Sequence, residues 1–449
     1  MNRFFLVAVL CAILAIATGC GRAVDADQLR LCRQTLPVLN PDGASFRISR
    51  SIAWRETGVR IEYRVKPPAG PETNRFVACE FAAGGLQINR QEMTKVTTER
   101  EELSESTLYL LKRFWLETPD ATLADPGAAA DIEAQEALSV PRNLAIFLQH
   151  GVSALPGMAI YALLASAYAL IYGLIGRINL AFGEFAALGG IAAGLAISIA
   201  LIFKLESVGL LLLISTCAAL GVAVLHATVV SRLILQPLAG RPGQHVLVAT
   251  IGLAIALQEY LRLTQGNGTR WVSPIFNNPL VLARAGGFAV TITPIALAVT
   301  AVAICAALLL LAFLAHSRYG RHWRAVADDP LAAALFGVSA ATVYAETFAL
   351  ACGLAGLAGL IVTLYYGGLG YAGGTALGLK SLVGAVAGGI GSVPGAMLGG
   401  LLVGLIETLW SGFLPIMHRD IALFALLIIL LALKPGGLFG FGQLLPRKV

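Results

Sequence analysis

Charged side chains are few in this chain of 449 residues, and they are nearly missing from its larger part. Asp, Glu, Lys and Arg make up 13% of the residues, against roughly a quarter in soluble domains. Of the 26 acidic residues, 18 lie between residues 21 and 142 and 8 in all that follows. Since hydrophobic residues make up 57% of the chain, the part after residue 142 is predicted to lie in lipid.

The sequence also lacks the motifs of common enzymes and metal sites. Its charged N-terminal part has no histidine, no GxSxG and no glycine-rich phosphate loop. Gly373–Ser381 comes near to the phosphate-binding pattern, but Leu379 stands between the second glycine and Lys380. Three cysteines stand alone in apolar runs, without the spacing of metal ligands: Cys217, Cys305 and Cys352. We therefore expect no catalytic residue, no metal site and no cofactor in this chain.

The N-terminus has the three-part pattern of a secretory signal. Arg3 precedes an apolar run from Phe4 to Ala17, and small residues follow. Three outcomes stay open for residues 1–20: cleavage after Ala17, lipidation of Cys20 in an imperfect lipobox, or retention as an uncleaved anchor. Each of them exports the segment that follows.

Residues 21–142 are predicted to form a small extracytoplasmic α+β domain and a linker. Ser45–Val65 alternates apolar and polar residues around a turn, which predicts a hairpin. Phe76–Phe81 and Leu86–Ile88 are candidate strands of a second hairpin. Residues 95–116 are richer in helix formers, and the prolines that follow suit a linker.

Two cysteines remain in this domain after the signal. An oxidising compartment permits Cys32 and Cys79 to form a disulfide. Two separate buried thiols fit the sequence equally well, so both alternatives stay open.

After residue 142 the chain consists of long apolar runs separated by short gaps. A helix needs about 20 apolar residues to cross roughly 30 Å of hydrocarbon. Nine runs are long enough or nearly so, at about 148–175, 181–203, 207–231, 245–261, 287–315, 341–365, 376–391, 394–414 and 421–433. Glycines between 367 and 378 favour a broken or re-entrant segment there. Residues 143–449 are thus predicted to be an all-α polytopic domain with about 8 to 9 transmembrane helices.

Basic residues stand singly in the gaps between these runs. If the first span begins outside, the interior gaps satisfy the positive-inside rule with Arg177, Arg232, Arg241, Arg318, Arg321, Arg324, Lys434, Arg447 and Lys448. This places residues 21–142 in the periplasm and the C-terminus in the cytoplasm of a multi-pass protein of the bacterial inner membrane. Because these basic residues orient the chain in the membrane, they account for its net charge of +6. We therefore expect membrane lipid around this part of the chain and no nucleic acid as a partner.

Two stretches of the apolar part look like copies of each other. Tyr172–Gly176, with Glu184 downstream, corresponds to Tyr366–Gly370, with Lys380 downstream. Transporters build their substrate path where two repeats with interrupted helices meet. The residues expected along this path are Tyr172, Asn179, Gly183, Glu184, Lys380 and Gly391.

Glu184 and Lys380 carry opposite charges in apolar surroundings. A lone charge inside a membrane costs roughly 2.5 to 3.5 kcal/mol on insertion scales. We therefore expect the two side chains to face each other, a cavity or an interface. In the alternative, both extend to the same cytoplasmic surface.

Glycine pairs at GxxxG spacing are frequent near the C-terminus. They lie at 384–388, 395–399 and 400–404. Because such spacing lets helix backbones approach closely, it predicts a compact bundle.

The loop after the fifth long run holds the most informative polar residues. The positive-inside rule alone would explain its three arginines, but it leaves Trp323 and the acidic pair after it unexplained. A short amphipathic helix that docks into a partner accounts for all of them. The expected docking residues are Arg318, Tyr319, Gly320, Arg321, Arg324, Asp328, Asp329, Leu335 and Gly337.

From residue 148 to 440 the sequence resembles a known family, the integral-membrane permeases of bacterial branched-chain amino-acid ABC importers. The resemblance rests on Tyr168–Gly173, Ile178–Glu184, Ser317–Gly337, GGIGSVPGAMLGG from Gly388 and KPGGLFG from Lys434. It implies a fold similar to that of the vitamin B12 and ribose importer permeases. It also implies that Ser317–Gly337 is the coupling helix that enters a groove on the ATPase.

The resemblance implies a set of partners as well. Family members work as a pair of permeases, so a second permease subunit, identical or different, is expected. Two cytoplasmic ATPase subunits and a periplasmic substrate-binding protein complete the importer. ATP and Mg²⁺ belong on the ATPases, and this chain is a permease without enzymatic activity, for branched-chain or related amino acids.

Three other functions stay open. Permeases for urea and short-chain amides in the same superfamily can also carry an N-terminal extension, whereas ordinary branched-chain members begin close to the first span. A secondary transporter or channel would use broken helices and isolated charges but needs no docking loop. In the third alternative the exported domain is the functional unit and the spans are its anchor.

Overall fold

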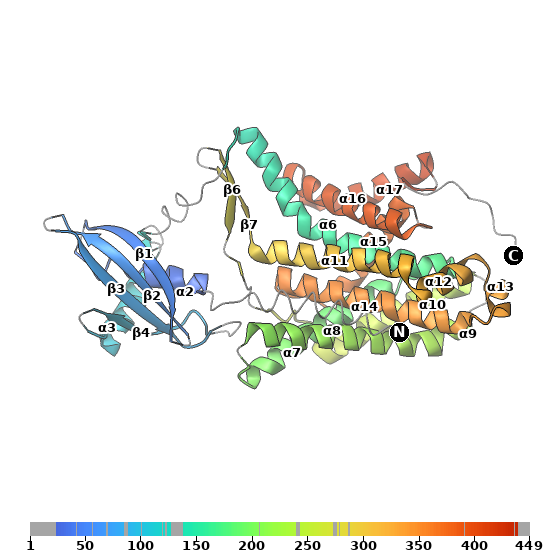
Figure 1. Ribbon diagram of the computed structural model, residues 1–449, viewed down its shortest axis with the longest axis horizontal. Helices are drawn as coiled ribbons and strands as arrows, with labels where there is room; N and C mark the ends of the chain where they lie inside the picture. Colours follow the sequence, from blue (N-terminus) through green and yellow to red (C-terminus); the bar gives the residue numbers. More distant parts are fainter. Residues whose placement is uncertain are drawn as a thin grey trace.

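The computed structural model describes residues 24–438, apart from 42, 56, 69–70, 85–88, 100, 119, 122–123, 127–137, 206, 239–242, 273–275, 278, 286–287, 390 and 435. Several sequence predictions lie outside the described residues: the signal at 1–20, the strand Leu86–Ile88, and the basic residues Arg241, Arg447 and Lys448. Figure 1 shows a sheet domain at one end of a long bundle of helices.

The sheet domain contains a four-stranded antiparallel sheet in the order β1-β2-β3-β4. Its elements are α2 (Ala26–Arg33), β1 (Ser45–Trp54), β2 (Gly58–Lys66), β3 (Thr73–Phe81), β4 (Met93–Thr98), α3 (Glu105–Leu111) and η1 (Lys112–Leu116). Alternate residues of β2 are buried because one face of the sheet packs against α2 and α3. The predicted hairpin Ser45–Val65 and the strand at Phe76–Phe81 are confirmed. Helix is wrong for residues 95–98, because Val96 is buried in β4 and pairs with β3.

A disulfide joins Cys32 of α2 to Cys79 of β3, with Cα atoms 5.8 Å apart. Both residues are fully buried, in the same cluster as Ile61 and Val77. The bond therefore ties helix α2 to the centre of the sheet.

Eight helical segments of the described chain are long and apolar enough to cross a membrane. They are α6 (Arg142–Ile175), α7 (Phe182–Ile202), α8 (Val208–Val230) with η2 (Ser231–Leu235) and α9 (Gln236–Leu238), α10 (Gly243–Gln265), α11 (Pro294–His316), α14 (Ala340–Tyr366), α16 (Val393–Phe413), and η3 (Ile416–His418) with α17 (Arg419–Leu433). The predicted fold, an all-α membrane part behind a small α+β domain, is confirmed.

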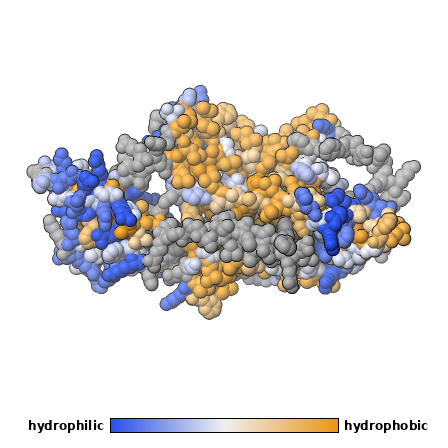
Figure 2. Space-filling model, viewed as in Figure 1, coloured by the Kyte–Doolittle hydropathy of each residue, from blue (hydrophilic) through white to orange (hydrophobic). Residues whose placement is uncertain are grey.

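Helix α14 lies at the centre of the bundle. Within the most apolar stretch of α14, 89% of the residues are buried inside the protein, against 28% for α10 and 6% for the stretch that contains α17. Small residues allow this burial, because Gly356 rests on Ala223 and Gly359 on Ala186. The outer helices present apolar side chains outward, and Figure 2 shows a hydrophobic belt between the polar sheet domain and a second polar region.

The two ends of the bundle differ in structure. At the end that carries the sheet domain, called the sheet end below, β5 (Leu138–Ser139), β6 (Leu280–Ala285) and β7 (Phe288–Ile292) form a three-stranded sheet. The Gln149 side chain adds hydrogen bonds to the backbone N and O of Thr291, at 2.7 and 3.2 Å. The opposite end, called the α12 end, carries the short helices α12 (Arg318–Asp328) and α13 (Pro330–Leu335).

Two of the nine predicted runs differ from the structure. The run 287–315 begins as strand β7, and helix α11 begins only at Pro294, after the capping residue Thr293. The run 376–391 corresponds to α15 (Gly373–Gly388), whose 16 residues span roughly 24 Å at 1.5 Å per residue. Since α15 is too short to cross the hydrocarbon alone, the prediction of a broken segment is confirmed.

Removal of the disulfide is expected to destabilise the sheet domain. The bond closes a loop over a sequence separation of 47, for which chain entropy gives about 4 kcal/mol. The double variant Cys32→Ala/Cys79→Ala should therefore lower the domain's resistance to urea in pulse proteolysis of the full chain. Cys217→Ala, which removes an exposed free thiol, is the control. An unchanged midpoint in the double variant would show that the bond adds nothing to stability.

Candidate functional site

Two helices of the bundle are interrupted in the same way. Helix α6 is capped by Gly176, with φ 67°, and α7 begins six residues after this cap, at Phe182. Helix α14 is capped by Gly367, with φ 83°, and α15 begins six residues after this cap, at Gly373. A left-handed glycine of this kind is a common helix stop, because it has no Cβ to clash. The two similar stretches of sequence are thus two helix–break–helix units.

The N-terminal turns of α7 and α15 touch each other directly. A Cβ on Gly183 would collide with the Gly374 carbonyl and lie 2.5 Å from the Gly378 Cα. A Cβ on Gly378 would lie 2.8 Å from the Gly183 Cα. This glycine contact, called the seam below, lets the two backbones meet where larger residues would hold them apart.

Glu184 lies within the seam. Its side chain is fully buried, and its Oε1 accepts a hydrogen bond of 2.6 Å from the Thr375 hydroxyl. Its Oε2 has no hydrogen-bond partner among the described residues. Glu184 stands in the first turn of α7 and Thr375 in the first turn of α15, where the helix dipoles favour negative charge.

The expected correspondence between Glu184 and Lys380 is wrong. Counted from the first residue of each helix, Glu184 of α7 corresponds to Thr375 of α15. Lys380 lies farther along α15, where its Nζ is 2.7 Å from Glu407 Oε1 and 3.2 Å from Asp420 Oδ1. The two charges neither pair with each other nor extend to a common surface, since each is at least nine-tenths buried.

The remaining residues expected along the path lie outside the seam. Asn179 shapes the turn between α6 and α7, where its backbone N–H donates to the Tyr168 hydroxyl and its Oδ1 accepts from Ala181 N–H. Tyr172 is half-buried in the last turn of α6. Gly391 is exposed in the turn after α15, and a Cβ added there would meet nothing within 4 Å.

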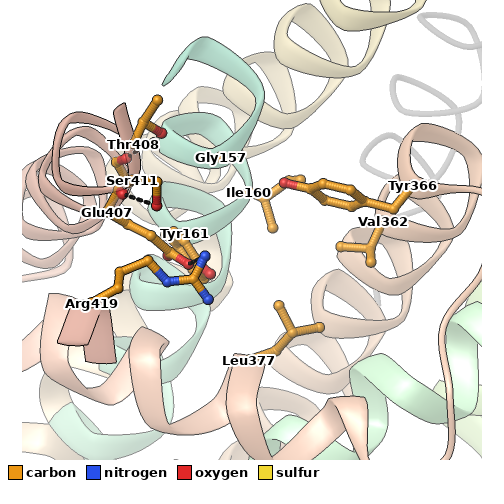
Figure 3. A pocket seen from close by; sticks show the side chains of 11 residues that line it. Gly157, Ile160, Tyr161, Val362, Tyr366, Leu377, Glu407, Thr408, Ser411 and Arg419 are labelled. Carbon is orange, nitrogen blue, oxygen red and sulfur yellow. Dashed lines mark hydrogen bonds and ion pairs between the residues drawn. The ribbon is translucent and has the colours of Figure 1, made fainter. Parts of the chain in front are cut away.

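A cavity of about 160 Å³ lies between α6, α14, α15, α16 and α17. Figure 3 shows its side chains, which divide into an apolar and a polar group. It is lined by Gly157, Ile160, Tyr161, Val362, Tyr366, Leu377, Gly404, Glu407, Thr408, Ser411 and Arg419.

Four charged residues meet beside this cavity. Glu407 Oε1 pairs with Lys380 and also with Arg419, whose Nη1 is 3.2 Å away. Asp420 pairs with both cations, at 3.2 and 3.4 Å. The two acids and two bases, called the charge cluster below, balance in net charge, which reduces the cost of burying them.

Of this cluster, only Lys380 is among the residues predicted from the sequence. Glu407, a carboxylate inside the apolar run 394–414, is the signal in the sequence that points to the rest. Such a residue marks a functional position by default, because burying it alone is costly.

The α12 end presents three large apolar side chains to solvent. Leu331, Leu335 and Phe336 are 80%, 88% and 88% exposed. Leu331 and Leu335 stand on α13 and Phe336 follows its last residue. This segment comes directly after the polar helix α12, which carries the exposed Arg318, Arg321 and Asp328. We call these three apolar residues the tip.

Several residues expected to dock also hold α12 and α13 in place. Gly320 rests against the Leu314 carbonyl without room for a Cβ, and Arg324 donates to the same carbonyl at 2.7 Å. Tyr319 bonds to Thr347 of α14 at 2.7 Å, and Asp329 caps α13. Gly337, with φ 80°, turns the chain away after the tip.

Trp323 joins α12 to the end of α6. Its Nε1 donates to the Leu170 carbonyl at 3.2 Å, and its ring lies against Gly173. Together with the bond between Tyr319 and Thr347, it connects α12 to both interrupted helices.

A Cβ at the seam is expected to prevent proper packing. Gly183→Val would push the N-terminal turn of α7 away from Gly374 and Gly378, a form of overpacking that typically costs about 1–3 kcal/mol. The matched control is Gly252→Val on α10, where a Cβ meets nothing within 4 Å. Size-exclusion chromatography after mild heating should show loss of the monodisperse peak for Gly183→Val alone. Equal survival of both variants would contradict the close contact.

Removal of Lys380 is expected to destabilise the bundle strongly. Its side chain is 8% exposed and that of Glu407 13%, and breaking a buried pair typically costs about 3–5 kcal/mol. Arg262→Met, which breaks the exposed pair with Glu259, should cost about 0–1 kcal/mol. Unfolding titrations in SDS would measure both. The double variant Lys380→Met/Glu407→Leu should recover most of the loss, and a further drop there would refute the pairing.

Comparison with known proteins agrees with this architecture. The family described as branched-chain amino acid transport system, permease component, matches residues 153–433. The high-affinity branched-chain amino acid transport system permease protein LivH of Escherichia coli K12 is 33% identical over 294 residues, which cover 66% of this chain and 96% of the relative. The corresponding protein BraD of Pseudomonas aeruginosa is 32% identical over the same length and coverage. No solved structure matches the chain. The chain belongs to the permease family of branched-chain amino acid ABC transport systems.

Proposed function

We propose that this chain carries branched-chain amino acids inward, as the permease of a bacterial importer driven by separate ATPase subunits. The exposed apolar tip beside the polar helix α12 gives this proposal its strongest support, because it offers a docking surface for such subunits. The relatives, which are named as branched-chain permeases, support the substrate class. ATP and Mg²⁺ are assigned to the ATPases, since the sequence of this chain has no phosphate-binding loop.

The tip is suited to dock into a groove of the ATPase. A small exposed apolar cluster flanked by charges is typical of a protein interface. Leu335 and Phe336 would fill the groove, while Arg321 and Asp328 would pair at its rim. The close contact of Gly320 and the hydrogen bond of Arg324 with the Leu314 carbonyl tie α12 to the end of α11, so that a movement of the ATPase would reach the bundle.

The disulfide supports an orientation for the chain. Bonds such as Cys32–Cys79 form and persist in oxidising compartments, including the bacterial periplasm. The proposal therefore puts the sheet domain, which follows the predicted signal in the sequence, outside together with the sheet end. The α12 end and its three arginines then lie in the cytoplasm, in agreement with the positive-inside rule.

A substrate-binding protein would then approach from the sheet end. A second permease subunit, identical or different, would cover part of the apolar surface of the outer helices. Closure of the ATPases would displace α12, and its links through Trp323 and Tyr319 would move α6 and α14 together. The helices α7 and α15 would slide past each other at the seam as the path opens inward, because no side chains interlock between its glycines.

Loss of the tip is expected to separate the permease from its ATPases. In Leu335→Ser/Phe336→Ser, two side chains that are 88% exposed become polar, and apolar anchors of interfaces are commonly worth about 2 kcal/mol or more. Co-purification of co-expressed ATPase subunits should fall at least about tenfold. Met417→Ser, which removes an exposed apolar residue from η3, should leave the yield unchanged. Retention of the ATPases by the double variant would exclude the tip as the docking site.

A further inference from the structure

The cavity between α6, α14, α15, α16 and α17 has one apolar and one polar side. Ile160, Val362 and Leu377 form the apolar side, and Ile160 and Val362 are 2% and 5% exposed. Glu407 and Arg419 lie across from them, with Thr408 and Ser411 along the same edge (Figure 3). A ligand of this cavity must therefore combine an apolar body with polar or charged groups.

The polar side has bonding capacity that the described residues leave unused. Glu407 Oε1 is shared by Lys380 and Arg419, but its Oε2 is buried without a hydrogen-bond partner among the described residues. The described ion pairs of Arg419 use its Nε and Nη1, and a guanidinium has five N–H donors. A buried carboxylate oxygen accepts an ammonium group well, and a guanidinium binds a carboxylate in bidentate geometry.

We propose that this cavity binds a zwitterionic α-amino acid with an aliphatic side chain, within the permease itself. The ammonium group binds Glu407, the carboxylate binds Arg419, and the side chain lies against Ile160, Val362 and Leu377. The inference deepens the proposed function and rests on it for the direction of transport. It adds a selection step in the membrane after release from the binding protein.

The charge balance favours a zwitterion over a single ion. Lys380, Arg419, Glu407 and Asp420 already compensate one another, so a lone cation or anion would leave one charge buried without a partner. A zwitterion adds one charge of each sign. The volume of about 160 Å³ corresponds to roughly five waters at about 30 Å³ each, which suits one amino acid.

The exposure of the charged residues indicates where the ligand enters. The side chains of Asp420 and Arg419 are 55% and 29% exposed, those of Glu407 and Lys380 only 13% and 8%. The entrance therefore lies at the start of α17, and Lys380 supports Glu407 from behind. Tyr366, in the last turn of α14, lines the cavity and stands beside the break in that helix. A ligand in the cavity would therefore contact a residue next to the break.

Gly157 offers a way to fill the cavity without touching a charge. It lines the cavity, and a Cβ there meets nothing within 4 Å. Gly151 lies on the same helix with equally open space around its Cβ, but it does not line the cavity. Gly157→Leu should weaken equilibrium binding of radiolabelled leucine to the importer complex, without added binding protein, at least about tenfold, or about 1.4 kcal/mol. Gly151→Leu should leave it within about twofold.

Leucine analogues test the two charged contacts separately. Wild type should bind 4-methylpentanoate, which lacks the ammonium group, and isopentylamine, which lacks the carboxylate, at least about tenfold more weakly than leucine, since each loses a charged hydrogen bond. Glu407→Gln should abolish the preference over 4-methylpentanoate, and Arg419→Gln the preference over isopentylamine. Glu259→Gln, at an exposed pair on α10, is the control.

Three results would overturn the inference. The first is leucine binding that is the same in Gly157→Leu as in wild type. The second is the absence of leucine binding from the wild-type complex. The third is phosphatidylethanolamine that co-purifies with wild type and is lost in Gly157→Leu, which would make the cavity a lipid headgroup site. The test with Gly157→Leu stands even if the charge variants fail to fold, because it changes no charged residue. Failure of ATP-driven uptake with intact leucine binding would contradict the proposed function and leave this inference standing.

Discussion

The first turns of α7 and α15 touch backbone to backbone, and this contact joins the two interrupted parts of the membrane bundle. Each helix begins after a break of six residues, and their backbones touch at Gly183, Gly374 and Gly378. Because no side chain separates them, the two interrupted units lie in direct backbone contact. Helix α14, the most buried of the spans, then packs along α7 through a second series of glycines. The seam therefore brings the two breaks of the bundle close together.

Buried charges surround this frame in two separate groups. Glu184 is stabilised by Thr375 and by the helix N-termini of the seam. The charge cluster of Lys380, Glu407, Arg419 and Asp420 joins α15 to α16 and α17 through ion pairs. Each group holds one carboxylate oxygen without a hydrogen-bond partner among the described residues. Unused acceptors of this kind are costly in lipid, and we interpret them as polar groups kept for a passing ligand or for movement.

The sequence predicted the membrane fold because lipid imposes strong rules on composition. Run length, glycine spacing and the repeated stretches at Tyr172 and Tyr366 predicted the spans, the close packing and the broken segment. The pairing of charges was not predictable, because it depends on which helices become neighbours. Lys380 is 27 residues from Glu407 in the sequence, and nothing local connects them. Strand β4 and the β6–β7 hairpin were missed for the same reason, since pairing partners outweighed local preference. In the α12 loop the residue types predicted a docking element, but only the fold separated the exposed tip from residues such as Gly320 that hold it.

A permease coupled to ATPases that dock at its α12 end should carry its substrate inward only while ATP is hydrolysed. Right-side-out membrane vesicles that contain the complete importer, with its binding protein outside and nucleotide trapped inside, allow uptake of radiolabelled leucine to be measured. We expect accumulation with ATP and none with a non-hydrolysable analogue or with an imposed proton gradient alone. Equal accumulation without ATP hydrolysis would rule out coupling to ATPases and would favour a secondary transporter.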